Sequence, residues 1–376
     1  MVRSTAVRQG AVLDVSPAGD RAEDSLDEAV GRALAGLLER QLEALEFLGE
    51  HTHSFVEPLR QFVLGRGKRL RPKLVYWGYR GAGGPAAGAT ARAALRLGCA
   101  IELVHAFALI QDDIMDGSRE RRFKPAVHVS FENLHRRERW RGDPARFGEA
   151  AGLLVADLAF ILGDAAVTAA ELPPARSAEV WRVFNELRLH LTGGQYLDVI
   201  QPCLGRPTER EARRIALYKS ARYTVEGPLR LGHAAAGGPL ELAATYTAYG
   251  NGLGEAFQLR DDVLGVFGDP EVTGKPAGDD IREGKQTMLV LLAGERAGTT
   301  GRKLLDAALG RQDVTAEQLD QVRELIVRTG ALDEVNRMID ELVLRAKRAV
   351  CADGALEEPV RDALVRLADR AAYRAT

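Results

Sequence analysis

The chain has 376 residues, of which 46% are hydrophobic and 28% charged, a balance typical of a folded globular protein. Its formal net charge of −2 gives no overall attraction to nucleic acid, so no nucleic-acid partner is expected. The cysteines Cys99, Cys203 and Cys351 have neither metal-ligand nor disulfide spacing, and we expect all three to be reduced, buried and in a cytoplasmic protein.

The N-terminal segment, residues 1–24, mixes Gly, Pro, Ser, Asp and Arg without periodicity, which is typical of a flexible tail. It has no apolar core of the kind found in secretory signals. Ser25 and Glu28 have the spacing of a capping box, so the first helix is expected to begin at Ser25. The sequence therefore predicts a tail over 1–24 and a helical domain over 25–376.

The longest apolar stretch, from Leu153 to Leu172, contains Asp157, Asp164 and Glu171. Three ionisable groups near the centre of a bilayer would be costly. We therefore expect a buried helix here, no membrane span, and a soluble protein.

Two further capping boxes, Thr208 with Glu211 and Thr315 with Gln318, predict helix starts, and Gly330 is expected to end the second helix. Segments with several Gly, Pro or charged residues are expected to be loops, at 65–72, 81–88, 136–144 and 268–280. Ala and Leu dominate, and no alternating strand run is bounded by hairpin turns. The predicted fold class is all-α, in one large domain.

The sharpest motif is DDIMD at 112–116, which follows an apolar helical run. Asp112 and Asp116 are four residues apart, so they lie on one face of a helix and repel unless a cation lies between them. A second acidic pair, Asp261 and Asp262, lies in another apolar helical segment. Oxygen ligands without nearby His or Cys suit Mg²⁺. The candidate metal ligands are Asp112, Asp113, Asp116, Asp261 and Asp262.

Basic side chains accompany both clusters. They are Lys68, Arg69, Arg71, Arg121, Arg122, Lys124, Lys219, Lys275 and Lys285. Metal-bound carboxylates on one side and Lys or Arg on the other can hold a phosphate group between them. No nucleotide-binding GxxxxGK[ST] or GxGxxG pattern is found. The pattern predicts an enzyme that stabilises negative charge on a phosphate leaving group.

Six ordered motifs resemble the trans-polyprenyl (isoprenyl) diphosphate synthase family, and the resemblance covers the chain from about Val30 onward. They are GKRLRP (67–72), DDIMD (112–116) followed by RRFKPAVH (121–128), GGQYLD (193–198), KSARYT (219–224), and GEAFQLRDDVLGVFGD (254–269) running into GKPAGDDIREGKQT (274–287). The resemblance implies a bundle of antiparallel helices around a deep central cavity, usually in a homodimer. It also implies head-to-tail condensation of isopentenyl diphosphate with an allylic diphosphate, which is dimethylallyl, geranyl or farnesyl diphosphate.

The resemblance assigns roles to single residues. Asp112 and Asp116 would ligate two Mg²⁺ ions and Asp261 a third, all bridging the allylic diphosphate. That diphosphate would be clamped by Arg121, Lys219 and Lys275, and Lys285 would also bind substrate. The pocket for isopentenyl diphosphate would be formed by Lys68, Arg71, His105 and Arg122. Ser220 and Gln258 would line the region where the allylic cation forms. His105 also lies two helical turns before Asp112, which favours a substrate role over a structural one.

Two positions depart from the family pattern. Gly265 stands where many relatives have a third Asp in the second acidic motif, and this should alter the surroundings of the metal more than abolish it. Phe123 stands where the usual RRG motif has Gly, and the bulky side chain should reshape the loop after Arg122.

Chain length in this family depends on the side chains four and five residues before the first Asp, here Ala108 and Phe107. One aromatic residue with a small neighbour resembles geranylgeranyl diphosphate synthases, so a C20 product is expected, with C15 and then C25 as alternatives. A terpene cyclase and a non-catalytic synthase subunit are the rival classes. The basic residues assigned to a second diphosphate argue against the cyclase, and the presence of both acidic clusters argues against the subunit.

Overall fold

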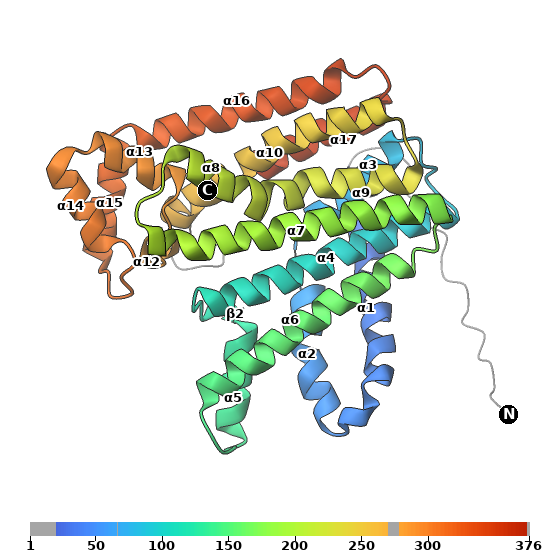
Figure 1. Cartoon of the computed structure of the whole chain (residues 1–376), viewed down its shortest axis with the longest axis horizontal. Coiled ribbons are helices and arrows are strands. Elements are labelled where there is room, and N and C mark those ends of the chain that lie inside the picture. Colours follow the sequence, from blue (N-terminus) through green and yellow to red (C-terminus); the bar gives the residue numbers. More distant parts are fainter. Residues whose placement is uncertain (1–19, 66, 270–277, 374–376) are drawn as a thin grey trace.

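The computed structural model describes residues 20–65, 67–269 and 278–373, and nearly all of its regular structure is helical (Figure 1). The first half contains α1 (Asp20–Ala44), the short helix η1 (Glu46–Leu48), α2 (His51–Leu64), α3 (Leu70–Gly81), α4 (Ala89–Met115), α5 (Val127–Arg137), α6 (Pro144–Thr168) and α7 (Pro174–Leu204). The second half contains α8 (Glu209–Ala216), the π-helix η2 (Leu217–Glu226), α9 (Gly227–Ala236), α10 (Leu240–Phe267), α12 (Asp279–Arg282), α13 (Met288–Arg296), α14 (Gly298–Ala308), α15 (Ala316–Arg328), α16 (Ala331–Ala352) and α17 (Glu358–Ala372). The all-α fold class is confirmed.

Helix starts were predicted correctly where a capping box satisfies free backbone N–H groups. Thr208 and Thr315 each accept a hydrogen bond from the third residue of the following helix, and Glu211 and Gln318 bond back to the caps. The prediction for Ser25 was wrong, because α1 begins at Asp20 and Ser25 lies inside it. The rest of the predicted tail, residues 1–19, lies outside the described residues.

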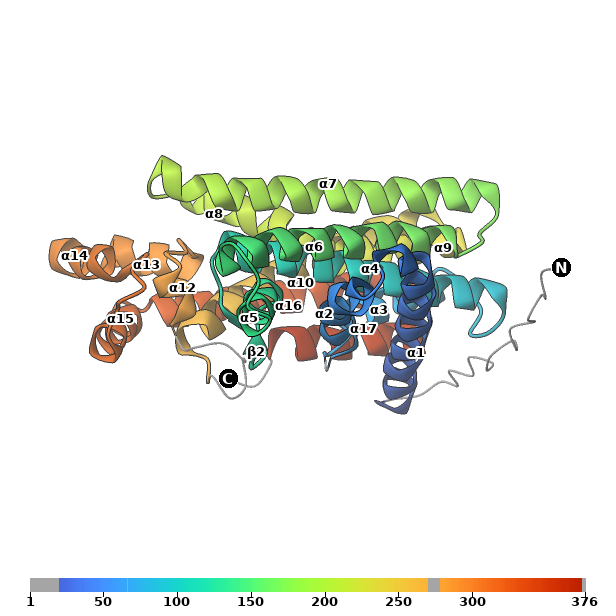
Figure 2. The ribbon, with the colours of Figure 1, turned by 90° about the horizontal axis from the view of Figure 1, so that it is seen from below.

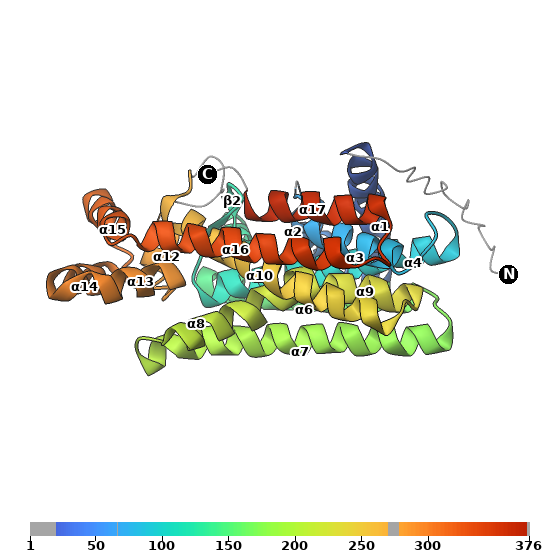
Figure 3. The same ribbon diagram turned by 90° about the horizontal axis from the view of Figure 1, so that it is seen from above.

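The long helices lie in layers around α4 and α10. α4 packs on α6, and α10 packs on α16, with η2 between α7 and α10. Figures 2 and 3 show α7 along one outer face and α16 with α17 toward the opposite side. In Figure 1, α4, α7 and α10 are parallel, because each runs from right to left between its N-terminal and C-terminal ends. Their polar residues can therefore meet at one end of the bundle.

Two glycines let η2 approach its neighbours closely. A Cβ atom at Gly194 of α7 would lie 2.2 Å from the backbone nitrogen of Lys219, and one at Gly254 of α10 would lie 2.6 Å from the Cβ of Ala221. Any larger residue would push η2 away from α7 or α10. π-Helical turns are rare and often lie at functional sites. Here the π-helix carries the KSARYT motif.

The predicted loops are confirmed only in part. Residues 82–88 and 138–143 lie between helices, whereas 136–137 end α5 and Pro144 begins α6. Of the loop predicted at 268–280, residues 270–277 lie outside the described residues and 279–280 begin α12. Residues 70–72 begin α3 instead of extending the first loop.

A two-residue hairpin, β1 (Glu120–Arg121) and β2 (Lys124–Pro125), was not predicted. Arg122 and Phe123 form its turn with φ of 53° and 62°, the left-handed region that favours glycine. Phe123 is strained in this turn and largely exposed.

The apolar stretch 153–172 falls mostly in α6, which is only partly buried: Leu154 and Ile161 are exposed. By length and composition alone, α4 and α6 would be long and apolar enough to cross a membrane, although 67% and 50% of their most apolar windows are buried inside the protein. Cys99 is buried as expected, whereas Cys203 and Cys351 are exposed.

Candidate active site

A cavity of about 2350 Å³ opens between α4, η2 and α10. One face of α4 supplies His105, Ala108, Asp112 and Asp116 to its wall, at the spacing of three and four residues that a helix requires. The face predicted from DDIMD and His105 is therefore the face that lines the cavity.

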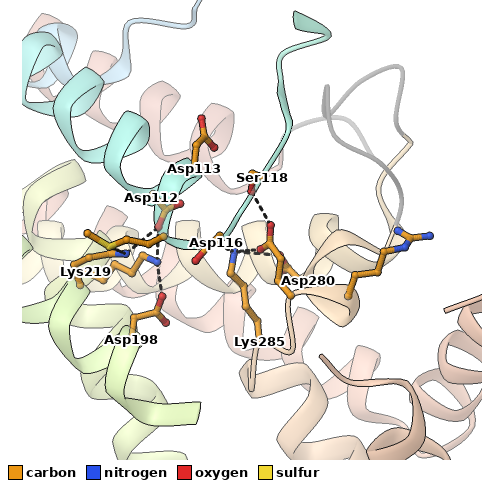
Figure 4. A network of polar contacts seen from close by, with 12 residues as sticks. Asp112, Asp113, Asp116, Ser118, Asp198, Lys219, Asp280 and Lys285 are labelled. Carbon is orange, nitrogen blue, oxygen red and sulfur yellow. Dashed lines mark hydrogen bonds and ion pairs between the residues drawn. The ribbon is translucent and has the colours of Figure 1, made fainter. Parts of the chain in front are cut away.

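Asp112 lies at the centre of a polar network (Figure 4). Its Oδ1 accepts hydrogen bonds from Lys219 Nζ at 3.0 Å and from Gln195 Nε2 at 3.1 Å, and Lys219 also reaches Asp198 at 2.5 Å. Burial by itself would raise the pKa of Asp112, but Lys219, Lys285 and Arg121 outweigh it and hold that pKa well below its usual range. Asp112 is therefore ionised and ready to bind a cation.

Asp113 points away from this network in Figure 4. It is fully buried, and both of its carboxylate oxygens accept from Arg121 Nε at 2.8 Å. The adjacent acids of DDIMD thus face different partners. In this arrangement Asp113 orients Arg121, whose other contact is with Asp112 at 3.7 Å.

Asp116 lies one turn further along α4 and meets Lys285 at 3.4 Å. Lys285 also contacts Asp280 at 3.7 Å and Glu283, and Ser118 donates to Glu283 at 3.0 Å. Burial, only partly opposed by Lys285, raises the pKa of Asp116 to about 6. Three carboxylates thus share one ammonium group, so negative charge is in local excess.

The second acidic pair lies across the cavity on α10. Both Asp261 and Asp262 line the wall, and Gln258, one turn earlier, donates to Asp262 at 2.8 Å. Burial and then Asp280 raise the pKa of Asp262 to about 8. Two facing helices therefore present carboxylates to the same space.

A basic pocket adjoins the first cluster. Arg71 is buried and donates to Tyr223 Oη at 2.8 Å and to Thr224 at 2.9 Å, and the guanidinium lies 4.5 Å from the centroid of the Tyr223 ring. His105 Nδ1 lies 2.7 Å from the same Tyr223 hydroxyl. Burial, reinforced by Arg71, lowers the pKa of His105 well below its usual value, so the ring is neutral. Lys68, Arg122 and Ser220 also line the cavity.

The cavity becomes apolar one turn away from the acids. Ala108, Leu191 and Phe257 line it, each four residues before a polar residue of the same helix. Phe107 is not among the lining residues of the described chain; its ring packs against Phe160 with centroids 4.8 Å apart. Of the two predicted chain-length residues, Ala108 faces the cavity.

The donor set fits magnesium. All the acidic candidates offer oxygen, the ligand that Mg²⁺ prefers. Burial and then neighbouring carboxylates raise the pKa values of Asp116 and Asp262, and a divalent cation would favour their ionised forms. Within the described part of the chain, no group of three or more His, Cys, Asp or Glu side chains forms a metal site by itself.

The structure brings most of the predicted residues together and adds several that the sequence did not single out. Lys275 lies outside the described residues. Six of the additional polar residues at the cavity contact the predicted ones or lie beside them, namely Gln195, Asp198, Tyr223, Thr224, Asp280 and Glu283. All six fall within the quoted motifs, but the motif spacing does not tell which of their side chains point inward.

Comparison with known proteins agrees with this geometry. A model of the polyprenyl synthetase family matches residues 52–326. Geranylfarnesyl diphosphate synthase from Aeropyrum pernix is 32% identical over 313 residues, covering 81% of this chain and 89% of that protein. Geranylgeranyl diphosphate synthase from Methanosarcina mazei is 29% identical over 310 residues, covering 82% and 86%.

A solved structure is also similar. Geranylgeranyl pyrophosphate synthase from Corynebacterium glutamicum, complexed with isoprenyl diphosphate and magnesium, superposes with a TM-score of 0.88 at 34% identity, covering 94% of this chain and 99% of that one. The chain therefore belongs to the polyprenyl synthetase family and is an isoprenyl diphosphate synthase.

Proposed function

We propose that this protein is a magnesium-dependent prenyltransferase that adds isopentenyl diphosphate head to tail to an allylic diphosphate and releases a linear C20 diphosphate. The observation that carries the proposal is the layered cavity. Carboxylates of α4 meet Lys219 of η2, Arg121 of β1 and Lys285, which follows α12. Apolar side chains line the cavity beside them. A diphosphate fits the first layer and a prenyl chain the second.

The reaction breaks one C–O bond and one C–H bond and forms one C–C bond. The C1–O bond of the allylic substrate breaks, and its electron pair leaves with the diphosphate. The double bond of isopentenyl diphosphate then attacks C1, and the proton lost from C2 of the isopentenyl unit goes to the departed pyrophosphate. No side-chain base is required, and the charged layer supplies what the first step needs, which is positive charge on the leaving group.

The cavity residues divide between the two substrates. Lys219 and Arg121 are assigned to the allylic diphosphate, together with Lys285 and, by sequence, Lys275. Asp112, Asp116 and Asp261 would hold magnesium, which when bound supplies further positive charge to the leaving diphosphate. Arg71, Lys68, Arg122 and His105 are assigned to isopentenyl diphosphate. Asp113 acts through Arg121, because its oxygens hold that guanidinium in place.

The wall of the cavity combines a few polar groups with apolar side chains that would exclude competing water. Ser220 and Gln258 both line the cavity, and Gln258 donates a hydrogen bond to Asp262. An allylic cation survives only where water is kept out, so walls of Leu, Ala and Phe beside a few fixed polar groups suit the reaction.

The proposed C20 product rests on Ala108. A methyl side chain facing the cavity leaves room for a chain that a larger residue would stop, and each buried methylene is favourable by about 0.8 kcal/mol. Relatives named for C20 and C25 products occur among the similar proteins, so the family match alone does not choose the length.

We also propose a soluble, cytoplasmic homodimer. Exposed apolar side chains gather on α6 and α7, among them Leu154, Ile161 and Leu189, and the ion pair between Arg188 and Asp164 at 2.6 Å links these two helices. Large exposed apolar patches usually contact another protein surface. A second copy covering α6 and α7 would bury them.

A product assay tests the function directly. The purified protein is incubated with Mg²⁺, isopentenyl diphosphate and dimethylallyl, geranyl or farnesyl diphosphate. We expect linear diphosphates ending at C20. Hydrocarbon products would instead identify a cyclase, and absence of turnover with every starter would identify a non-catalytic subunit.

A further inference from the structure

The second acidic motif, residues 261–265, ends in a glycine, and the side chain of Asp280 fills the space beside that glycine. The motif reads DDVLG, with Gly265 one turn after Asp261 on the same face of α10. A Cβ atom at Gly265 would lie 2.0 Å from Oδ2 and 2.4 Å from Cγ of Asp280. The carboxylate of Asp280 therefore occupies the place where a side chain at 265 would begin.

The backbone of α12 holds Asp280 in this place. The four-residue helix lies between Gly278 and Gly284, whose φ values of 78° and 75° are accessible mainly to glycine. Ile281 is fully buried, and its carbonyl accepts from Gly310 N at 2.9 Å. The position of the Asp280 carboxylate thus follows from a fixed turn and not from a free surface side chain.

Asp280 also connects the two acidic clusters. It lies 3.7 Å from Lys285 Nζ, which reaches Asp116 of the first cluster at 3.4 Å. Among charged neighbours, Asp280 has the largest electrostatic effect on Asp262 of the second cluster. Figure 4 shows Asp280 and Lys285 approaching Asp116 from the side opposite Lys219.

We propose that Asp280 is a positioning residue of the second acidic cluster, which supplies from α12 the third carboxylate that Gly265 does not provide. This inference rests on the proposed function, since it assumes that the second cluster holds magnesium with a diphosphate. The alternative is that Asp280 serves only as an ion-pair partner of Lys285. The proposal predicts that a carboxylate placed at position 265 of α10 can replace the carboxylate of Asp280 in magnesium binding.

The test moves the carboxylate. Asp280→Asn and Asp280→Ala remove the charge, and the double variant Asp280→Ala with Gly265→Asp restores a carboxylate to the same space from α10. Asp333→Asn is the control, because it removes the same charge at an exposed position of α16 that does not line the cavity. The melting temperature of each protein is followed as Mg²⁺ is titrated in the presence of inorganic pyrophosphate, together with circular dichroism to verify folding and with the elongation rate.

The midpoint Mg²⁺ concentration for stabilisation should rise about 10-fold in both Asp280 variants, the size expected when a residue that orients metal ligands is lost. The midpoint should return toward the parental value in the double variant, and it should equal the parental value in Asp333→Asn. Parental midpoints in folded Asp280 variants would overturn the inference, as would a folded double variant that binds no better than Asp280→Ala. Failure of the proposed function is a separate result, because the parent itself would then show neither elongation nor stabilisation, and the inference would fail with it.

Discussion

The same helices build two parts of the cavity wall, a charged layer around Asp112 and Gln195 and an apolar layer around Ala108 and Leu191. Under the proposed function, the charged layer would govern the rate of the reaction and the apolar layer the length of the product. On α4 the change from Asp112 to Ala108 takes one turn, and on α7 the change from Gln195 to Leu191 does the same. In that function, the charged layer would determine which bond breaks, because it concentrates lysine and arginine where negative charge develops. The apolar layer would determine how long a hydrocarbon chain the cavity can hold.

The two layers also differ in what a substitution should do. A change in the charged layer removes stabilisation of the transition state and should lower the rate with little effect on which product forms. A change in the apolar layer should alter the product with a smaller effect on the rate. Two predictions test this division, and two further ones test how residues beside the cavity affect stability.

Lys219→Met should cause the largest loss. Lys219 bonds Asp112 and Asp198, and although burial lowers its pKa, those carboxylates outweigh the effect and raise that pKa to about 12, so the side chain carries a full charge. Methionine keeps the stem and removes the charge. We expect kcat for elongation to fall about 10²-fold to 10³-fold with unchanged product length. Lys303→Met, at an exposed position, is the control, and a parental rate in Lys219→Met would contradict the assignment.

Ala108→Phe should change the product and not the chemistry. An aromatic ring on the cavity wall blocks the space that the last isoprene unit needs, so products should shift from C20 toward C15, as measured by chromatography of the dephosphorylated alcohols. Ala108→Ser, which keeps the size of the side chain, should still give C20. Unshifted products in folded Ala108→Phe would show that the chain does not extend past residue 108.

His105→Gln should reduce the acid sensitivity of folding. Burial and the neighbouring arginines lower the pKa of His105 in the folded state, so below about pH 6.5 the unfolded chain binds a proton that the folded chain does not. This group contributes stability above that pH and loses it as pH falls, by about 1.4 kcal/mol per pH unit. Urea unfolding at pH 7.5 and 5.5 should show a smaller loss in the variant. Equal losses would mean that His105 is protonated in the folded protein.

Phe123→Gly should have the smallest effect, a gain in stability. Phe123 adopts a left-handed backbone that costs a non-glycine residue about 1–2 kcal/mol, and glycine avoids that cost at some loss of chain entropy. We expect the free energy of unfolding to rise by about 1 kcal/mol. Phe123→Ala keeps the Cβ atom and should show no gain, so a variant with alanine as stable as the one with glycine would exclude backbone strain as the cause.

Sequence alone predicted the features that depend on local spacing. The helical period placed His105, Asp112 and Asp116 on one face, and the capping boxes at Thr208 and Thr315 predicted helix starts. These depend on interactions within a few residues, which a single sequence contains.

Features that depend on tertiary packing were not predictable. The opposite orientation of Asp113 follows from its burial against Arg121, and the π-helix that turns Tyr223 toward His105 depends on glycines in α7 and α10. Similarly, Phe107 faces Phe160 of α6, and Asp280 fills the space beside Gly265. Arg121 lies eight residues from Asp113, beyond helical spacing, and the other partners lie on separate helices.

The most direct test removes one carboxylate from each side of the cavity. With Asp112 and Asp261 both changed to Ala, transfer of labelled isopentenyl diphosphate to geranyl diphosphate should fall by about 10³-fold or more, while the circular dichroism spectrum remains that of the parent. A folded double variant that elongates prenyl chains as fast as the parent would contradict the claim that these acids hold the cations on which diphosphate departure depends.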